Sequence, residues 1–423
     1  MIDSHPTRLK RFEMKRTDHE QSQRINVSFR DLVSEIPRTT YGTFGIYKYP
    51  AKFIPQIVAY PIKEFAKKDD VIFDPFAGYG TVGVVSRVYG HDYVLWDLNP
   101  LMELIHDTAV MEKPSLDVGS LMTRLKKSKD EFTPKWSRMK YWFPEEFIPM
   151  ISTAWGYAHS ANQEESLLLK IPLVKTTRFF SWSDEKTHKL YKSKFARKKV
   201  KELLESDWEN QFYAMLEKGM RDLLKGLSEY SRMGPKNVKS TLKSGIDTLS
   251  TDLDGEVDML ITSPPYLQAQ EYIRSTKLEL YWLGYSDADI KELGNKEIPY
   301  NPVEEVEINS NTFHKYREQI QEPHLLKLYD RYFHAMIGTF SRIGKRVRNR
   351  MCIFVGPAKI RTTKIPIDDI LVEHLVHDGW EHEVTYVDTI VSRVMFKSKV
   401  NPASGLEDER MKTEHLVVLK KRS

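Results

Sequence analysis

A glycine-rich segment between two short apolar runs constrains the fold of this chain more than any other feature. The first run, Val71–Asp74, continues into Asp-Pro-Phe-Ala-Gly-Tyr-Gly-Thr over residues 74–81, and a second run follows at Tyr93–Asp97. Short apolar runs that end in a polar residue are typical of buried parallel strands. A glycine-rich turn that enters a helix presents free backbone N–H groups to a ligand. The pattern predicts part of a doubly wound α/β sheet, with a ligand site at the carboxyl ends of its strands.

The ligand that the glycine-rich segment predicts is nucleotide-like. Asp97 ends the second predicted strand, 19 residues after Gly78, where an acidic side chain commonly binds ribose hydroxyls. No Gly-Lys-Ser/Thr follows, which disfavours a phosphate-binding P-loop, and the third glycine of a dinucleotide fingerprint is absent. Asp247 ends a possible strand from Thr241 and is a candidate for the adenine ring, although a surface aspartate fits the same pattern.

A second motif, Thr-Ser-Pro-Pro-Tyr over residues 262–266, follows the apolar run Val257–Thr262. An exocyclic amine on a nucleobase is a poor nucleophile, because its lone pair is delocalised into the ring. A serine oxygen and a proline carbonyl can accept the amine hydrogens, and the rigid Pro-Pro pair directs that carbonyl. Tyr266 offers a ring on which an extruded base can stack. Pro-Pro is also common in ordinary turns, so the position after a strand matters.

Together the two motifs resemble those of the S-adenosylmethionine-dependent DNA amino-methyltransferases of restriction–modification type, which methylate cytosine N4 or adenine N6. Tyr49–Pro55 resembles the stretch that closes over the methionine end of the cofactor. The resemblance implies S-adenosylmethionine as cofactor, double-stranded DNA as substrate, a cognate restriction endonuclease as functional partner and no metal. The cofactor residues that it implies are Lys52, Phe53, Asp74, Phe76, Ala77, Gly78, Gly80, Thr81, Asp97, Leu98, Asn99 and Thr262, and the catalytic ones are Ser263, Pro264, Pro265 and Tyr266.

The target base is predicted from the first residue of the catalytic motif. Serine at this position is more usual in cytosine-N4 enzymes, so we expect methylation of cytosine N4. Ser-Pro-Pro-Tyr also occurs in adenine-N6 enzymes, which are the main alternative. An RNA guanine-N2 methyltransferase usually has Asp-Pro-Pro-Tyr and an added RNA-binding domain. An alternative of another class is an inactive nucleic-acid-binding module on this fold, against which the intact Ser263, Gly78 and Asp97 argue.

Cations and aromatic residues alternate between Lys175 and Lys201, a combination suited to phosphates and unpaired bases. A solvated basic helix over a small core explains the same stretch. The polar stretch Asp287–Glu322 is a second candidate for target recognition. We expect DNA contacts from Arg178, Lys194, Arg197, Lys198 and Lys199.

The predicted fold is a Rossmann-like methyltransferase mixed sheet with a mostly helical insert as second domain. We expect a basic N-terminal arm over 1–39, a cofactor-binding half over 40–115, the insert and candidate target-recognition region over 116–238, and a catalytic half over 239–423. The single cysteine, Cys352, lies in an apolar run and indicates a core thiol, which excludes an intramolecular disulfide and leaves no thiolate nucleophile. The chain has no bilayer-length apolar stretch and no signal-peptide pattern, so we expect a cytoplasmic protein.

Overall fold

The computed structural model describes residues 23–50, 52–185, 190–267, 271–298, 300–389 and 413–422. Within them, one eight-stranded sheet has the order β1-β9-β10-β6-β5-β2-β3-β4. Strand β10 is antiparallel to both of its neighbours, whereas the other pairings in the sheet are parallel. This arrangement confirms the predicted Rossmann-like mixed sheet. Its strands are β1 (Arg24–Val27), β2 (Ile72–Asp74), β3 (Tyr93–Asp97), β4 (Ser240–Ser244), β5 (Val257–Thr262), β6 (Val347–Val355), β9 (Trp380–Thr389) and β10 (Thr413–Lys421).

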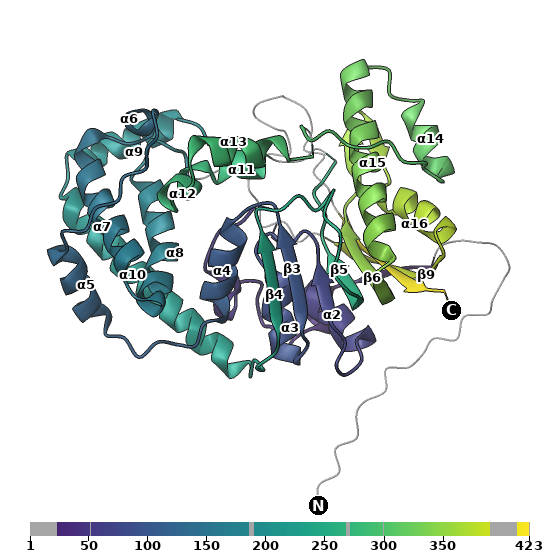
Figure 1. The fold of residues 1–423 in the computed structure, drawn as a ribbon, viewed down its shortest axis with the longest axis horizontal. Helices are drawn as coiled ribbons and strands as arrows, with labels where there is room; N and C mark the ends of the chain where they lie inside the picture. The colour runs from purple at the N-terminus through teal and green to yellow at the C-terminus, as the bar shows by residue number, and fades with distance from the viewer. Residues whose placement is uncertain are drawn as a thin grey trace, which may run out of the picture.

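Helices cover both faces of the sheet, which is why its central strands are continuous apolar runs (Figure 1). Alternate residues of β2 enter different cores: Ile72 packs in one apolar cluster and Phe73 in the other. The first cluster lies under α2 (Pro55–Phe65), α3 (Thr81–Tyr89) and α4 (Leu101–Val110), and the second under α15 (Pro323–Gly344) and α16 (Ile367–His377).

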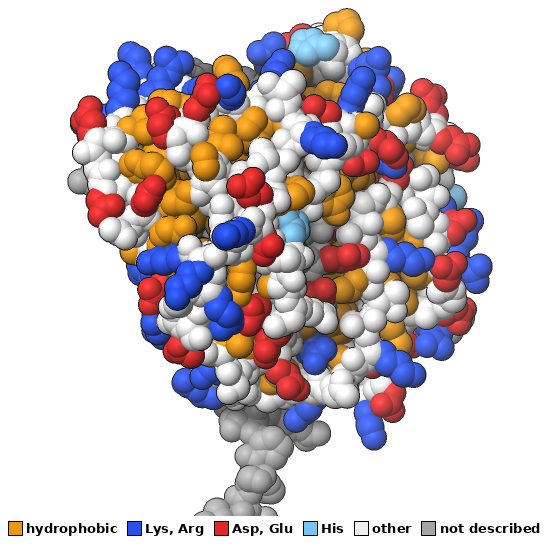
Figure 2. Space-filling view, turned by 60° about the vertical axis from the view of Figure 1, so that its left-hand side comes forward, with side chains coloured by type: hydrophobic (Ala, Val, Ile, Leu, Met, Phe, Trp, Pro, Cys, Tyr) orange, Lys and Arg blue, Asp and Glu red, His pale blue; other side chains and the backbone are white. Residues whose placement is uncertain are grey.

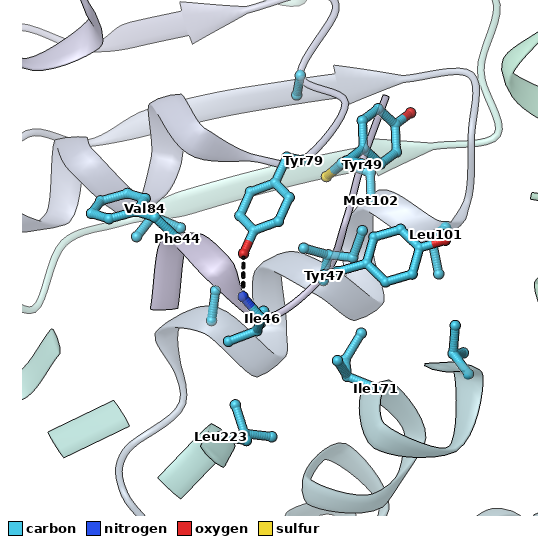
Figure 3. Packing of buried hydrophobic residues seen from close by; sticks show 14 of the residues in the cluster. Phe44, Ile46, Tyr47, Tyr49, Tyr79, Val84, Leu101, Met102, Ile171 and Leu223 are labelled. Carbon is cyan, nitrogen blue, oxygen red and sulfur yellow. Dashed lines mark hydrogen bonds between the residues drawn. The ribbon is translucent and has the colours of Figure 1, made fainter. Parts of the chain in front are cut away.

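The segment between β3 and β4 is helical and lies at one end of the sheet (Figure 1). Its apolar side chains do not form a separate core, because Ile171 and Leu223 pack in the same cluster as Tyr79 and Leu101 of the cofactor half (Figure 3). After α4, this insert contains α5 (Val118–Lys127), α6 (Met139–Trp142), η2 (Glu145–Phe147), α7 (Ile148–Ser160), α8 (Gln163–Phe179), α9 (Lys194–Leu204) and α10 (Trp208–Arg232).

Part of the predicted N-terminal arm belongs to the folded unit. Strand β1 pairs with β9, and Arg24 forms ion pairs with Asp368 and Asp369 of α16. Phe29 of α1 (Phe29–Leu32) is buried, and η1 (Gly42–Gly45) follows. The prediction of an arm over 1–39 is therefore wrong from residue 23 onward, while residues 1–22 lie outside the described residues.

The segment after the catalytic motif is built from short helices that lie above the sheet in Figure 1. Helix α15 ends at Gly344, and Val347 then begins β6 and pairs with Val257. Among the described residues, no helix is long and apolar enough to cross a membrane. The remaining elements are α11 (Tyr272–Ser275), α12 (Lys277–Trp282), α13 (Asp287–Asn295), α14 (Asn311–Arg317) and the hairpin of β7 (Ala358–Ile360) and β8 (Thr363–Ile365).

Candidate active site

A mostly apolar cavity lies where β2, β3 and β5 end, so the carboxyl ends of these strands form its floor as the sequence predicts. Both predicted motifs reach it. The predicted residues that line the cavity are Lys52, Phe53, Asp74, Phe76, Ala77, Gly78, Asp97, Leu98, Asn99, Ser263 and Pro265. The predicted residues that lie outside its lining are Gly80, Thr81, Thr262, Pro264 and Tyr266.

The two glycines of the cofactor loop adopt backbone conformations that favour glycine. Gly78 has φ +53°, and a Cβ there would lie 3.1 Å from Cε1 of Tyr49. Gly80 has φ +81° and precedes the first residue of α3. The Thr81 hydroxyl donates to the carbonyl oxygen of Phe53 at 3.1 Å. Gly80 and Thr81 therefore support the conformation of the loop from outside the cavity lining, whereas Gly78 forms part of the cavity wall.

Asp97 is held at the cavity by two backbone donors. Its Oδ2 accepts from the N–H of Gly78 at 2.7 Å, and its Oδ1 accepts from the N–H of Asn99 at 2.7 Å. Burial raises the pKa of the Asp97 carboxyl to about 6, against the lowering effect of these donors. A carboxylate oxygen has two lone pairs, so both oxygens retain capacity for a ligand hydroxyl.

A buried hydrogen bond joins the cofactor loop to the catalytic loop. The Thr262 hydroxyl donates to Oδ1 of Asp74 at 2.6 Å, and the same oxygen accepts from the N–H of Phe76 at 3.0 Å. Burial raises the pKa of Asp74 to about 7. Ser263 and Pro265, directly after Thr262, face the cavity. Thr262, the last residue of β5, thus fixes the position of the catalytic loop relative to the cofactor loop.

Lys52 supports the wall of the cavity from the stretch that precedes β2. Its Nζ donates to the carbonyl oxygen of Phe44 and lies 4.6 Å from the ring centre of Tyr79. Burial lowers the pKa of this amine to about 8. The Tyr79 hydroxyl donates to the carbonyl of Thr43 at 2.5 Å and accepts from the N–H of Ile46 (Figure 3).

Tyr266 is tied to the last strand of the sheet. Its hydroxyl donates to Oε1 of Glu414 at 2.7 Å, and β10, which carries Glu414, is the antiparallel strand. Burial raises the pKa of the Tyr266 hydroxyl and that of the Glu414 carboxyl. The bond orients the ring beside the cavity rather than in its wall, and stacking on a base remains a prediction.

Two of the five predicted DNA-contacting cations, Arg178 and Lys199, make contacts within the protein, which argues against a DNA contact. Arg178 is paired with Glu279 of α12 at 2.8 Å and donates to the carbonyl of Ser275. Lys199 is 8% exposed, with its Nζ 4.8 Å from the ring centre of Phe179. Helix α9 turns this lysine inward with the apolar side chains of its buried face. The cations of α9 that are exposed are Lys194, Arg197, Lys198 and Lys201.

Several lining residues were not predicted. Tyr49 stacks on Tyr272 with ring centres 6.3 Å apart, and both face the cavity. Glu297 and Ile298 reach it from the loop after α13, a polar stretch that carries no recognisable motif. Asp247, the candidate for the adenine ring, also lines the cavity, with Thr248 and Leu249 beside it. The position of Tyr272 in the helix that follows the catalytic motif could have indicated it from the sequence. No sequence signal indicates Glu297.

Within the described residues, no group of three His, Cys, Asp or Glu side chains is arranged to hold a metal ion. His374 is engaged otherwise, since its Nδ1 accepts from the N–H of Asn309 at 3.1 Å. Cys352 is buried in β6, and burial raises the pKa of its thiol.

Comparison with known proteins agrees with this geometry. Residues 6–106 match the DNA methylase family N6_N4_Mtase. Type II methyltransferase M.BsoBI of Geobacillus stearothermophilus is 25% identical over 64% of this chain and 58% of its own length. M.MvaI of Kocuria varians is 23% identical over 62% of each chain, and M.MjaII of Methanocaldococcus jannaschii is 33% identical over 26% of this chain and 22% of its own.

These matches confirm the predicted resemblance to DNA amino-methyltransferases of restriction–modification type. The chain spans less than two thirds of the length of each of these relatives. The cofactor of such enzymes is S-adenosylmethionine, and the cavity fits it. Asp97 offers acceptors for ribose hydroxyls, Gly78 leaves room for close approach, and Phe76 and Leu98 supply apolar walls.

Asp74 predicts a pH dependence of stability. Its folded pKa of about 7 lies above its ordinary value of 3.8, so the folded state retains a proton that the unfolded chain releases. The corresponding stability is present below pH 4 and is lost as pH rises through 7. We expect Asp74→Asn to lose less stability than wild type between pH 5 and pH 8, with a difference of up to about 3 kcal/mol. Denaturant unfolding at both pH values measures it, and equal losses in both proteins would contradict it.

Proposed function

We propose that this chain transfers a methyl group from S-adenosylmethionine to cytosine N4 in duplex DNA, on a base flipped out of the helix, as the protective enzyme of a restriction–modification system. The observation that supports this most is that Ser263 and Pro265 share one cavity with Gly78 and Asp97. A methyl donor bound by the glycine loop would therefore lie next to acceptors for an amine. The type II methyltransferases among its relatives support the same activity.

Ser263 and the Pro264 carbonyl would accept the hydrogens of the target amine, which localises its lone pair for attack. S-adenosylmethionine, when bound, supplies an electrophilic methyl group on a sulfonium. Asp97 would hold its ribose, with Gly78, Leu98 and the other lining residues around it. Tyr266, held by Glu414, would stack on the flipped base. The buried Cys352 has no place in this reaction.

Methylation of adenine N6 is the second candidate, because the same motif supports either exocyclic amine. The proposal for cytosine rests on the serine at position 263. The purified chain, incubated with S-adenosylmethionine and mixed-sequence duplex DNA, should yield N4-methylcytosine in the digested nucleosides by mass spectrometry. Formation of N6-methyladenine instead would overturn the assignment of the target base. If neither product forms on DNA of any sequence, the proposed methyltransferase activity is contradicted.

Ser263→Ala should lower kcat by about 100-fold or more, since the serine acts on the amine during transfer. The affinity for S-adenosylhomocysteine, measured by calorimetry, should change less than about threefold. Ser231→Ala, at the exposed end of α10, is the matched control and should methylate at the wild-type rate. Wild-type turnover by the Ser263 variant would reduce this serine to a structural residue.

The exposed cations of α9 support a DNA contact by the insert. Lys194 and Lys198 are four residues apart and so share a helix face, and several Lys and Arg side chains lie along the upper edge of the surface in Figure 2. Aromatic side chains adjoin them: Lys192 lies 3.6 Å from the ring centre of Tyr141, which is 54% exposed. This combination suits a nucleic-acid backbone and its bases.

Replacing Lys194 and Lys198 with glutamine should weaken DNA binding and reduce the slope of log affinity against log salt by about one unit per lost contact. Cofactor affinity should stay unchanged. Lys67→Gln with Lys68→Gln is the matched control, because these exposed lysines precede β2 at the opposite end of the strand from the cavity. Unchanged salt slopes in the folded α9 variant would make the loop and helices over 287–322 the better candidate for recognition.

A further inference from the structure

Glu297 places a further carboxyl group in the cavity that Asp74, Asp97 and Asp247 also line. Glu297 lies in the loop after α13, lines the cavity and is 7% exposed. Two turns fix its backbone, because the N–H groups of Tyr300 and Asn301 both donate to its carbonyl oxygen at 2.8 Å. Asn301 also donates to Oδ2 of Asp247 at 3.0 Å, which anchors the loop to the cavity rim. Glu297 is thus held in place before any ligand binds.

The carboxylate of Glu297 has backbone donors and, within the described residues, no Lys or Arg partner. Its Oε1 accepts from the N–H of Ile273 at 3.0 Å, and the backbone of Tyr272 also donates to the carboxylate. Burial raises the pKa of this carboxyl to about 7, and the charge of Asp97 adds to the rise. Lys52 and Lys296 also line the cavity, but the Lys52 amine donates to the carbonyl of Phe44 and the Lys296 amine donates to Oε1 of Glu292. A buried carboxyl group without a cation partner is costly unless a ligand supplies donors.

Asp97 and Glu297 lie close enough for their charges to interact, and both act on Tyr272, whose ring lines the cavity with them. A ribose carries two adjacent hydroxyls, each of which needs an acceptor. One carboxylate at the end of β3 and a second from the loop after α13 provide acceptors on two sides. The Tyr49–Tyr272 stack forms part of the wall beside them.

We propose that Glu297 is a ribose-binding residue that shares the cofactor's vicinal diol with Asp97. This inference rests on the proposed function, since it assigns a residue to the cofactor of that reaction. It gives the loop 296–298 a direct role in cofactor selection, with Ile298 as an apolar neighbour in the same wall.

The competing explanation is structural: Glu297 accepts from the N–H of Ile273 and so supports the start of α11. The two roles separate by substitution. Glu297→Gln keeps the volume and one oxygen for the N–H of Ile273 but removes the second acceptor oxygen. Glu297→Ala removes both. Glu305→Gln changes the same charge at an exposed position of the following loop and is the matched control.

Calorimetric titration with S-adenosylhomocysteine tests the proposal without DNA or turnover. Glu297→Gln should raise Kd about tenfold or more while keeping the wild-type thermal midpoint, and Glu305→Gln should bind like wild type. Analogues that lack the 2′- or the 3′-hydroxyl sharpen the assignment. For at least one analogue, removing the hydroxyl should cost much less affinity in Glu297→Gln than in wild type. The reason is that the hydroxyl and the missing acceptor would form the same hydrogen bond.

Two results would overturn the proposal. One is a wild-type Kd for Glu297→Gln. The other is a weakened Kd with equal losses for both deoxy analogues in the variant and in wild type, which would assign Glu297 to loop support alone. Failure of the wild-type chain to bind S-adenosylhomocysteine at all would instead contradict the proposed function, so the two failures are distinguishable.

Discussion

One hydrogen bond, from the Thr262 hydroxyl to Asp74, connects the two loops on which the candidate active site depends. These residues are 188 positions apart in the chain, yet β2 and β5 are neighbours in the sheet. Because the strands are parallel, both loops leave the sheet at the same edge. The bond is buried, where a hydrogen bond is strong and its loss leaves an unsatisfied group. It sets the distance between the loop proposed for the methyl donor and the loop proposed for the amine.

The insert is part of the scaffold around this site. Arg178 of α8 and Glu279 of α12 form a nearly buried ion pair, and the Tyr47 hydroxyl donates to the same carboxylate oxygen at 3.4 Å. Breaking a buried pair by removing one partner typically costs about 3–5 kcal/mol, since the other charge stays buried. The pair joins the insert to the helix after the catalytic loop, while Trp136 stacks on Tyr281 of that helix with ring centres 4.1 Å apart. The insert is therefore packed against the helix that follows the catalytic loop.

The cavity concentrates carboxyl groups in an apolar setting. Asp74 and Glu297 are buried and Asp97 is partly buried, and desolvation raises the pKa of each. Such groups cost stability, and they are characteristic of sites arranged for a ligand rather than for folding. Among the described residues, Lys52 and Lys296 are the Lys or Arg side chains that line the cavity. The Lys52 amine is turned toward backbone carbonyls and the Tyr79 ring, and the Lys296 amine donates to Oε1 of Glu292. A ligand with hydroxyl groups and a positive charge would provide partners for these carboxyl groups.

The sequence by itself determined the parts that depend on local pattern. Apolar runs predicted β2, β3 and β5, and the ability of Gly78 and Gly80 to adopt positive φ is a property of glycine itself. Tertiary structure decided which charged side chains are available. Arg178 and Lys199 belong to the same basic stretch as Lys194, but Lys199 is buried and Arg178 is paired with Glu279 of the distant helix α12. Glu297 carries no motif and acquires its place only when the loop after α13 folds over β3. Whether a side chain is buried depends on neighbours that are far apart in the chain, so it cannot be predicted from the local sequence pattern.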